Sequence, residues 1–325
     1  MRRALLALLC LAASAPAAAQ PDDGYEDFLR TVGVLGIASE DFAHAQIAIV
    51  DLSTAPEIGG ASFRSENGAP GLDFDSLRLP FSITRPVARL DADLVLDFAL
   101  STQGVDEDAF ALLPDLFPER EAVLAGSWRA YSGFVGAGLR WPLGDTDVSV
   151  RPLLGLSSAR IADRTEVGGA DAAIVREAFD GTLLDWSVWT LAAVPAVELA
   201  YERRRAVHVR VATRVSYHMT RTLARDGFLE LSSDDPLASA RVDLGGDFPF
   251  TLGRFGLGWR LNAGTQHLLG DLGEALPFDR YHDFGAALAL GIGHLGLGAE
   301  NVLVRGVVIT GPDLSGWGLG FGLEL

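Results

Sequence analysis

The clearest pattern in the chain is an alternation of apolar and polar side chains from Val207 to Met219. Valine, threonine, tyrosine and methionine occupy the odd positions, whereas the even positions hold two arginines, two histidines, an alanine and a serine. Successive side chains of a strand point to opposite faces, so this segment predicts a strand with one apolar and one charged face. It is longer than a typical globular strand and close to what a tilted membrane strand requires.

The same alternation recurs along most of the chain. It predicts eleven strands, at residues 75–85, 89–100, 126–141, 146–160, 185–200, 204–219, 238–248, 253–266, 283–293, 294–304 and 315–325. A twelfth strand is expected before them, at 43–51 or at 58–64, because bacterial membrane barrels have an even number of strands. Ten and fourteen strands are the alternatives.

The links between these strands alternate in length. Short links are expected near residues 86–89, 142–146, 201–205, 249–253 and 293–294, and long ones near 101–123, 161–183, 220–237, 268–281 and 305–314. Outer-membrane barrels have short periplasmic turns and longer outer loops, a regularity that soluble sandwiches and propellers do not require. The sequence therefore predicts an all-β fold, a transmembrane antiparallel β-barrel of about 12 strands over residues 42–325.

The N-terminal segment predicts export. Residues 1–19 combine a basic start, an apolar centre and small residues at Ala17 and Ala19, which is typical of a secretory signal peptide cleaved after Ala19. Residues 20–41 carry apolar side chains at helical spacing and are either a periplasmic leader or a helix in or under the lumen. The expected location is the bacterial outer membrane.

Composition narrows the function classes. The chain has 325 residues, 49% of them hydrophobic, a net charge of −17 and a single cysteine, Cys10, within the predicted signal peptide. A disordered chain and a disulfide scaffold are therefore excluded, and nucleic-acid binding is disfavoured because an acidic surface repels phosphates. Acidic residues also gather in the expected outer loops.

The polar strand faces predict a charged lumen. The chain contains no lysine, and arginine can hold a carboxylate bidentately in a confined space. We expect a packed polar lumen, with a narrow channel for small solutes or ions as the alternative. The lumen-lining candidates are Arg140, Arg151, His208, Arg210, Arg214, His218, Arg241, Arg254, Arg260, Asp91, Asp93, Asp97, Glu198 and Glu300.

No motif predicts catalysis, a metal or a cofactor. The chain contains no HExxH, no GxSxG and no P-loop, and its histidines are scattered. Barrel hydrolases that act on lipid are the enzymatic alternative. The nearest approach to the His-x-Ser pattern of the lipid A deacylase family is His218-Met219-Thr220, with threonine in place of serine. We expect a non-enzymatic protein.

The last strand completes a resemblance to a known family. Apolar or aromatic residues alternate with glycine and one glutamate from Trp317 to Leu325, and residues 45–53 and 58–63 form the entry segment of the barrel. This arrangement resembles the solitary outer-membrane autotransporter barrels, which lack a passenger domain. The resemblance implies a monomer held in outer-membrane lipid and recognised by the barrel-insertion machinery through Trp317–Leu325. Outer-membrane proteins usually end in phenylalanine or tryptophan, whereas Leu325 is last here. About twenty residues follow Ala19 before the first possible strand, too few for a passenger.

Overall fold

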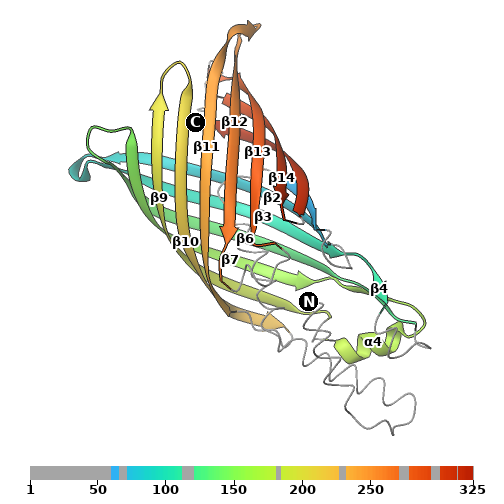
Figure 1. Ribbon diagram of the computed structural model, residues 1–325. Coiled ribbons are helices and arrows are strands. Elements are labelled where there is room, and N and C mark those ends of the chain that lie inside the picture. The colour runs from blue at the N-terminus through green and yellow to red at the C-terminus, as the bar shows by residue number, and fades with distance from the viewer. Residues whose placement is uncertain are drawn as a thin grey trace.

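The computed structural model describes residues 60–65, 72–111, 121–180, 184–226, 232–270, 278–293, 301–312 and 314–324. The predicted signal peptide, the leader, the possible strand at 43–51 and Glu300 lie outside these residues. Twelve strands form a closed antiparallel barrel (Figure 1). They are β1 (Gly60–Ser65), β2 (Leu72–Val87), β3 (Ala92–Glu107), β6 (Ser127–Pro142), β7 (Val148–Asp163), β9 (Ser187–Arg204), β10 (His208–Asp226), β11 (Ser232–Leu252), β12 (Phe255–Leu268), β13 (Arg280–Gly291), β14 (Asn301–Gly311) and β15 (Leu314–Glu324).

The barrel closes through its shortest strand. β1 has six residues and pairs on one side with β2 and on the other with β15, both antiparallel. This closure covers Leu72–Leu77 of β2 and Leu314–Gly318 of β15. Pairing of sheet edges in this way is what a membrane-spanning sheet requires. The predicted antiparallel barrel of about twelve strands is confirmed, and β1 overlaps the predicted strand at 58–64.

Strand pairing also fixes how the barrel is staggered. Following paired residues from Asp75 of β2 through β3, β6 and β7 leads to Ser187 of β9. Following them in the other direction around the barrel, from β1 and β15 to β10, leads to Tyr201 of β9. These residues are fourteen positions apart along β9, so the shear number is fourteen. With twelve strands at usual spacings, this corresponds to a tilt of about 39°.

The outward face carries an apolar band with aromatic side chains at both ends. On β6 the band lies between Tyr131 and Trp141, and on β9 between Trp189 and Tyr201. Allowing for about 1.2 residues of stagger per strand, Trp141, Tyr201 and Trp259 fall on one circumference at the turn side. Aromatic girdles of this kind mark the two interfaces of a membrane.

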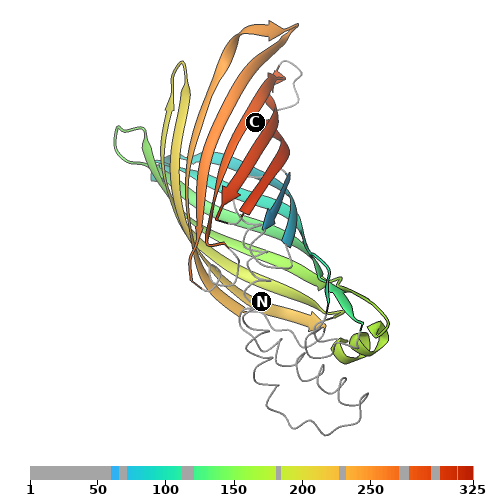
Figure 2. The same ribbon diagram turned by 45° about the vertical axis from the view of Figure 1, so that its right-hand side comes forward.

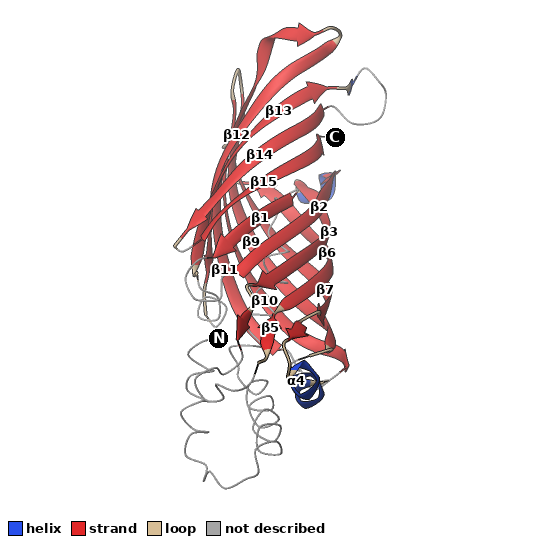
Figure 3. Cartoon of the chain, turned by 90° about the vertical axis from the view of Figure 1, so that its right-hand side faces the viewer, coloured by secondary structure: helices blue, strands red, loops and turns tan. Residues whose placement is uncertain are grey.

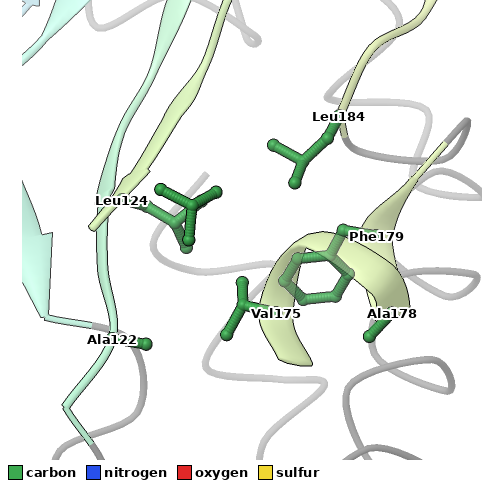
Figure 4. Packing of buried hydrophobic residues seen from close by; sticks show 7 residues of the cluster. Ala122, Leu124, Val175, Ala178, Phe179 and Leu184 are labelled. Carbon is green, nitrogen blue, oxygen red and sulfur yellow. The ribbon is translucent and has the colours of Figure 1, made fainter. Parts of the chain in front are cut away.

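Two long links fold together beyond the barrel. They contribute β4 (Phe110–Ala111), β5 (Val123–Ala125) and β8 (Glu166–Gly168), which form a three-stranded sheet, and the helix α4 (Ala172–Phe179). Leu124, Val175, Phe179 and Leu184 are buried in a hydrophobic cluster between the sheet and the helix (Figure 4). We call this the loop unit; the sequence had suggested only acidic loops.

The loop unit lies at the end of the barrel opposite to the short turns. Figure 3 shows α4 at one end and the 3-10 helix η1 (Ala88–Leu90), in the turn between β2 and β3, at the other. The β11–β12 hairpin projects past its neighbours on the turn side (Figure 2), since Gly245 pairs with the first residue of β10 and β11 continues to Leu252. No helix of the described residues is long and apolar enough to cross a membrane.

One stretch of the sequence prediction was wrong. The strand predicted at 294–304 is β14, which begins at Asn301, and the long link predicted at 305–314 is mostly strand with a short connection to β15. Its inward Val307 and Ile309 are buried and its outward Val304 and Val308 are exposed. Because both faces of β14 are apolar, the period of two disappears from the sequence there.

Candidate functional site in the barrel lumen

Four strands contribute to one ion-pair network in the lumen. Arg151 of β7 bridges two carboxylates: its Nη1 lies 2.9 Å from Asp97 Oδ2 of β3, and its Nη2 lies 3.0 Å from Glu198 Oε2 of β9. Arg210 Nη2 of β10 lies 3.1 Å from the other Glu198 oxygen. The Arg151 side chain is only 12% exposed and that of Glu198 13%. Shared carboxylates of this kind fix arginine side chains in a confined space.

The network continues toward the short turns with higher exposure. Arg140 Nη2 of β6 lies 2.7 Å from Asp93 Oδ2 of β3, and both side chains are more than a third exposed. Nearer the turn, His208 Nε2 lies 3.3 Å from Glu202 Oε1. The charged lining therefore becomes more accessible toward the turn side.

A second network lines the strands from β11 to β14. Arg241 Nε lies 2.7 Å from Asp243 Oδ1, and the guanidinium groups of Arg241 and Arg305 lie 3.8 and 3.7 Å from Asp283 Oδ2. Asn262 donates a 2.8 Å hydrogen bond to the same oxygen. Asp283, Asn262 and Arg305 were not among the predicted lumen residues, although Asp283 and Asn262 alternate with apolar neighbours on predicted strands.

Buried polar side chains occupy the loop-side half of the lumen on β10 and β11. Ser216 Oγ and His218 Nε2 are 3.2 Å apart, and His218 pairs in register with Asp235. Thr220 pairs in register with Ser233, one step closer to the loops. His218 is 2% exposed, and Asp235 and Thr220 are fully buried.

Aromatic and apolar side chains complete the filling of this half. Phe74 of β2 contacts Phe278, which precedes β13, with ring centroids 6.3 Å apart, although three strands separate β2 from β13 around the wall. Tyr281 Oη donates a 2.7 Å hydrogen bond to Gln266, and Arg78 is 6% exposed. Inward-facing Ala99, Phe134, Leu153, Ala192, Val194 and Ala196 form a further buried cluster. The inner face is therefore not polar throughout.

Two residues that were predicted to line the lumen lie in turns instead. Asp91 lies in the turn after η1 with a φ of 46°, and Arg254 lies in the β11–β12 turn, its guanidinium 5.8 Å from the centre of the Phe255 ring. Both residues lie next to apolar positions at the ends of strands. At strand ends, the alternation of apolar and polar residues does not distinguish a residue of the barrel wall from a residue of a turn. Arg214 and Arg260 lie inward, and Gly245 leaves room for the Arg260 side chain.

Two acidic groups on the loop side have perturbed pKa values. Burial raises the pKa of the Glu107 carboxyl, at the loop end of β3, to about 7. Burial also raises the pKa of Asp163, at the loop end of β7, against the effect of hydrogen bonds from Thr165 and from the backbone N–H of Asp185. Within the described ranges, no group of three or more histidine, cysteine or acidic side chains could hold a metal ion.

Comparison with known proteins agrees with this architecture. The family model of the solitary outer membrane autotransporter beta-barrel domain matches residues 73–321. The translocator domain of the autotransporter NalP from Neisseria meningitidis is similar with a TM-score of 0.53 and 11% identity, over 90% of this chain and 98% of that one. The transport unit of the autotransporter AIDA-I from Escherichia coli has a TM-score of 0.50 and 9% identity, over 88% and 98%. No curated protein sequence matches this chain significantly.

Proposed function

Because the chain belongs to the solitary outer membrane autotransporter β-barrel family, we propose that it is a passenger-free barrel whose lumen is closed by its own side chains. In this proposal it spans the outer membrane and presents the loop unit outside the cell. The signal peptide cleaved after Ala19 delivers it, and the leader at residues 20–41 stays on the periplasmic side or enters the lumen.

The observation that carries the proposal is the double ion pair of Arg151. An open aqueous pore would hydrate this guanidinium, but its side chain is 12% exposed and binds carboxylates from two strands. Removing a charge from water is costly unless its partners satisfy it, and here Asp97 and Glu198 bind the two terminal nitrogens. The arrangement supports a lumen held shut by matched charges at this level.

The contact between Phe74 and Phe278 supports a second closure nearer the loops. It joins parts of the wall that are separated by three strands on the loop side, and buried His218, Asp235 and Thr220 lie on the same half. Packed aromatic and polar side chains leave little free bore in a barrel of twelve strands. The alternative, a narrow channel for small solutes or ions, requires these contacts to open.

We also propose that the barrel is non-enzymatic. Ser216 and His218 have the spacing of a nucleophile and its base, but at 2% exposure His218 offers no surface for a lipid ester. The pair instead links neighbouring inward positions of β10. Release of fatty acids from phospholipid by the purified protein, lost in His218→Ala, would contradict this assignment.

The proposed partners follow from the barrel itself. Outer-membrane lipid surrounds the apolar band, and the barrel-insertion machinery recognises the strand from Trp317 to Leu325. Closure of the wall by β1, which pairs with both β2 and β15 at the loop-side end, supports a monomer. The acidic loops disfavour nucleic acid as a partner.

The experiment that tests this proposal measures the conductance of the barrel. The purified protein is inserted into a planar lipid bilayer, with its shift in gel migration on boiling used to verify that it is folded. A closed lumen predicts no stable current steps. Regular steps of fixed conductance from the folded protein would replace this proposal with the channel.

A further inference from the structure

The outer surface carries a basic patch that the lumen proposal does not use. Arg129 of β6 and Arg160 of β7 point outward near the loop-side end of the wall. Arg164 continues the same register beyond β7, because its backbone N–H donates to Ser127 O at 2.7 Å. We call these three residues the arginine ledge. They stand out in a chain whose net charge is −17.

Two of the three guanidinium groups have no acidic partner among the described residues. Arg129 Nη2 lies 3.0 Å from Asp106 Oδ2, which neutralises it. Among the residues that the structure describes, no carboxylate lies within ion-pair distance of Arg160 or Arg164. The ledge therefore carries a net positive charge of about two at any pH near neutrality, since arginine stays protonated.

Aromatic side chains place the ledge at a membrane interface. Arg160 pairs in register with Tyr131 on one side and with Trp189 on the other. Both rings are about half exposed, at 53% and 47%, and belong to the loop-side girdle. Toward the turns, the outward positions of β7 beyond Ser158 are the exposed Leu156 and Leu154 of the apolar band. The Arg160 guanidinium thus lies where acyl chains give way to headgroups.

We propose that the arginine ledge binds the phosphate group of an anionic lipid in the outer leaflet. Guanidinium is weakly hydrated and matches phosphate bidentately, and an interfacial arginine costs far less than one at the bilayer midplane. Tyr131 and Trp189 would contact the glycerol or sugar region of the same lipid. The inference relies on the outer-membrane location and is independent of whether the lumen is closed.

Lipid selectivity tests the proposal directly. The folded protein is placed in mixed micelles of phosphatidylglycerol and phosphatidylcholine, and the lipids that remain bound are counted by native mass spectrometry. The wild type should retain phosphatidylglycerol preferentially, and Arg160→Gln/Arg164→Gln should reduce that preference about tenfold. Inorganic phosphate should not displace the bound lipid, whereas displacement would identify a site for free phosphate and overturn the lipid assignment.

A matched control distinguishes lipid binding by the arginine ledge from a general effect of surface charge. Arg221 also lies outward, on β10, but its Nη2 is bonded to both oxygens of Asp234 at 3.1 and 2.9 Å. Arg221→Gln should therefore leave the phosphatidylglycerol preference unchanged. Equal loss in Arg221→Gln and in the ledge variant, or no loss in either, would overturn the proposal. If the double variant does not fold, Arg160→Lys supplies the test, because lysine keeps the charge but loses bidentate binding, and a several-fold loss is expected.

Discussion

Arg151 of β7 is ion-paired with Asp97 of β3 at 2.9 Å, although β6 lies between their two strands. Asp97 pairs in register with Gly136 of β6, and the next inward position of that strand toward the turns is Gly138. A Cβ at Gly136 would meet the Phe134 ring and Leu153, and one at Gly138 would meet the backbone oxygen of Pro152, so these glycines make room for the packing of β6 against β7. The ion pair thus ties β3 to β7 across β6, a contact that backbone pairing of neighbouring strands does not provide.

Loss of Arg151 should both destabilise the barrel and loosen its closure. In Arg151→Ala, Asp97 loses this ion pair in a poorly hydrated site, while Glu198 keeps Arg210. Breaking a buried ion pair by removing one partner costs about 3–5 kcal/mol. We expect a drop of this order in the free energy of unfolding, measured by denaturant titration in micelles, and current steps in a planar bilayer that the wild type lacks.

Arg204→Ala provides the comparison for this variant. Arg204 is 80% exposed at the turn end of β9, and its one ion pair with the described residues is to Glu202. Exposed pairs contribute little, so stability and conductance should match the wild type. If Arg151→Ala behaved like Arg204→Ala, the network would not hold the lumen closed.

The sequence predicted this network only in part. Alternation placed Arg151, Asp97, Glu198 and Arg210 on one face, because each belongs to a strand with a clear period of two. It could not show which residues pair, since the pairing depends on the shear of the barrel. In the second network it missed Arg305, which belongs to a strand that is apolar on both faces.

The lipid-facing assignment has a depth-dependent consequence. Val215 of β10 is 59% exposed and pairs with Val197, which lies between Trp189 and Tyr201 on β9. Val215→Arg should cost about 2–4 kcal/mol, because it places a charge near the bilayer midplane. The free energy of unfolding in lipid vesicles measures this cost.

Two further substitutions on β10 calibrate the result. Val209 is also outward but pairs with Arg203, beyond the turn-side girdle, so Val209→Arg should cost about 0–1 kcal/mol. Ala212 faces the lumen, and Ala212→Ser should be nearly neutral. Equal costs for arginine at positions 215 and 209 would mean that the apolar band does not mark the membrane.

The loop unit should be able to unfold while the barrel stays folded. Phe179 of α4 is 1% exposed and packs in the cluster with Val175 and Leu184. Phe179→Ala removes a buried ring, a change that typically costs about 3–5 kcal/mol, which is enough to melt so small a unit. We expect rapid proteolysis within residues 121–126 and 164–180, outside the barrel strands, and an unchanged shift in gel migration on boiling.

The exposed position 177 on the same helix supplies the matched control. Glu177→Ala keeps the helix and its buried face, so its proteolysis should match that of the wild type. Resistance of Phe179→Ala to protease would show that the loop unit does not depend on its hydrophobic cluster.

The loop unit could not be predicted from alternation. Its strands have only two or three residues, too few to display a period, and β5 and β8 come from different links between barrel strands. The barrel wall, by contrast, consists of long strands that pair mostly with their sequence neighbours. Pattern reading therefore recovers the wall and fails where short segments from distant loops meet.

Glu107 should make the loop side of the barrel sensitive to pH. Burial raises the pKa of its carboxyl from 4.5 to about 7, so the folded state holds the proton more tightly than the unfolded state. The resulting stabilisation is complete below pH 4.5 and is lost as the pH rises through about 7. The backbone N–H of Glu107 donates to Gly126 O at 2.8 Å, which couples this carboxyl to the start of β6.

Glu107→Gln should remove this dependence, because an amide stays neutral throughout the range. The measurement is amide hydrogen exchange at residues 123–127, compared between variant and wild type at each pH. Because the raised pKa of Asp163 is common to both proteins, the difference between them reports the ionisation of Glu107 alone. The two proteins should exchange alike near pH 5, and the wild type should exchange faster at pH 8, where its buried carboxylate is charged. If variant and wild type exchanged identically at both pH values, ionised Glu107 would be hydrated without any loss of stability.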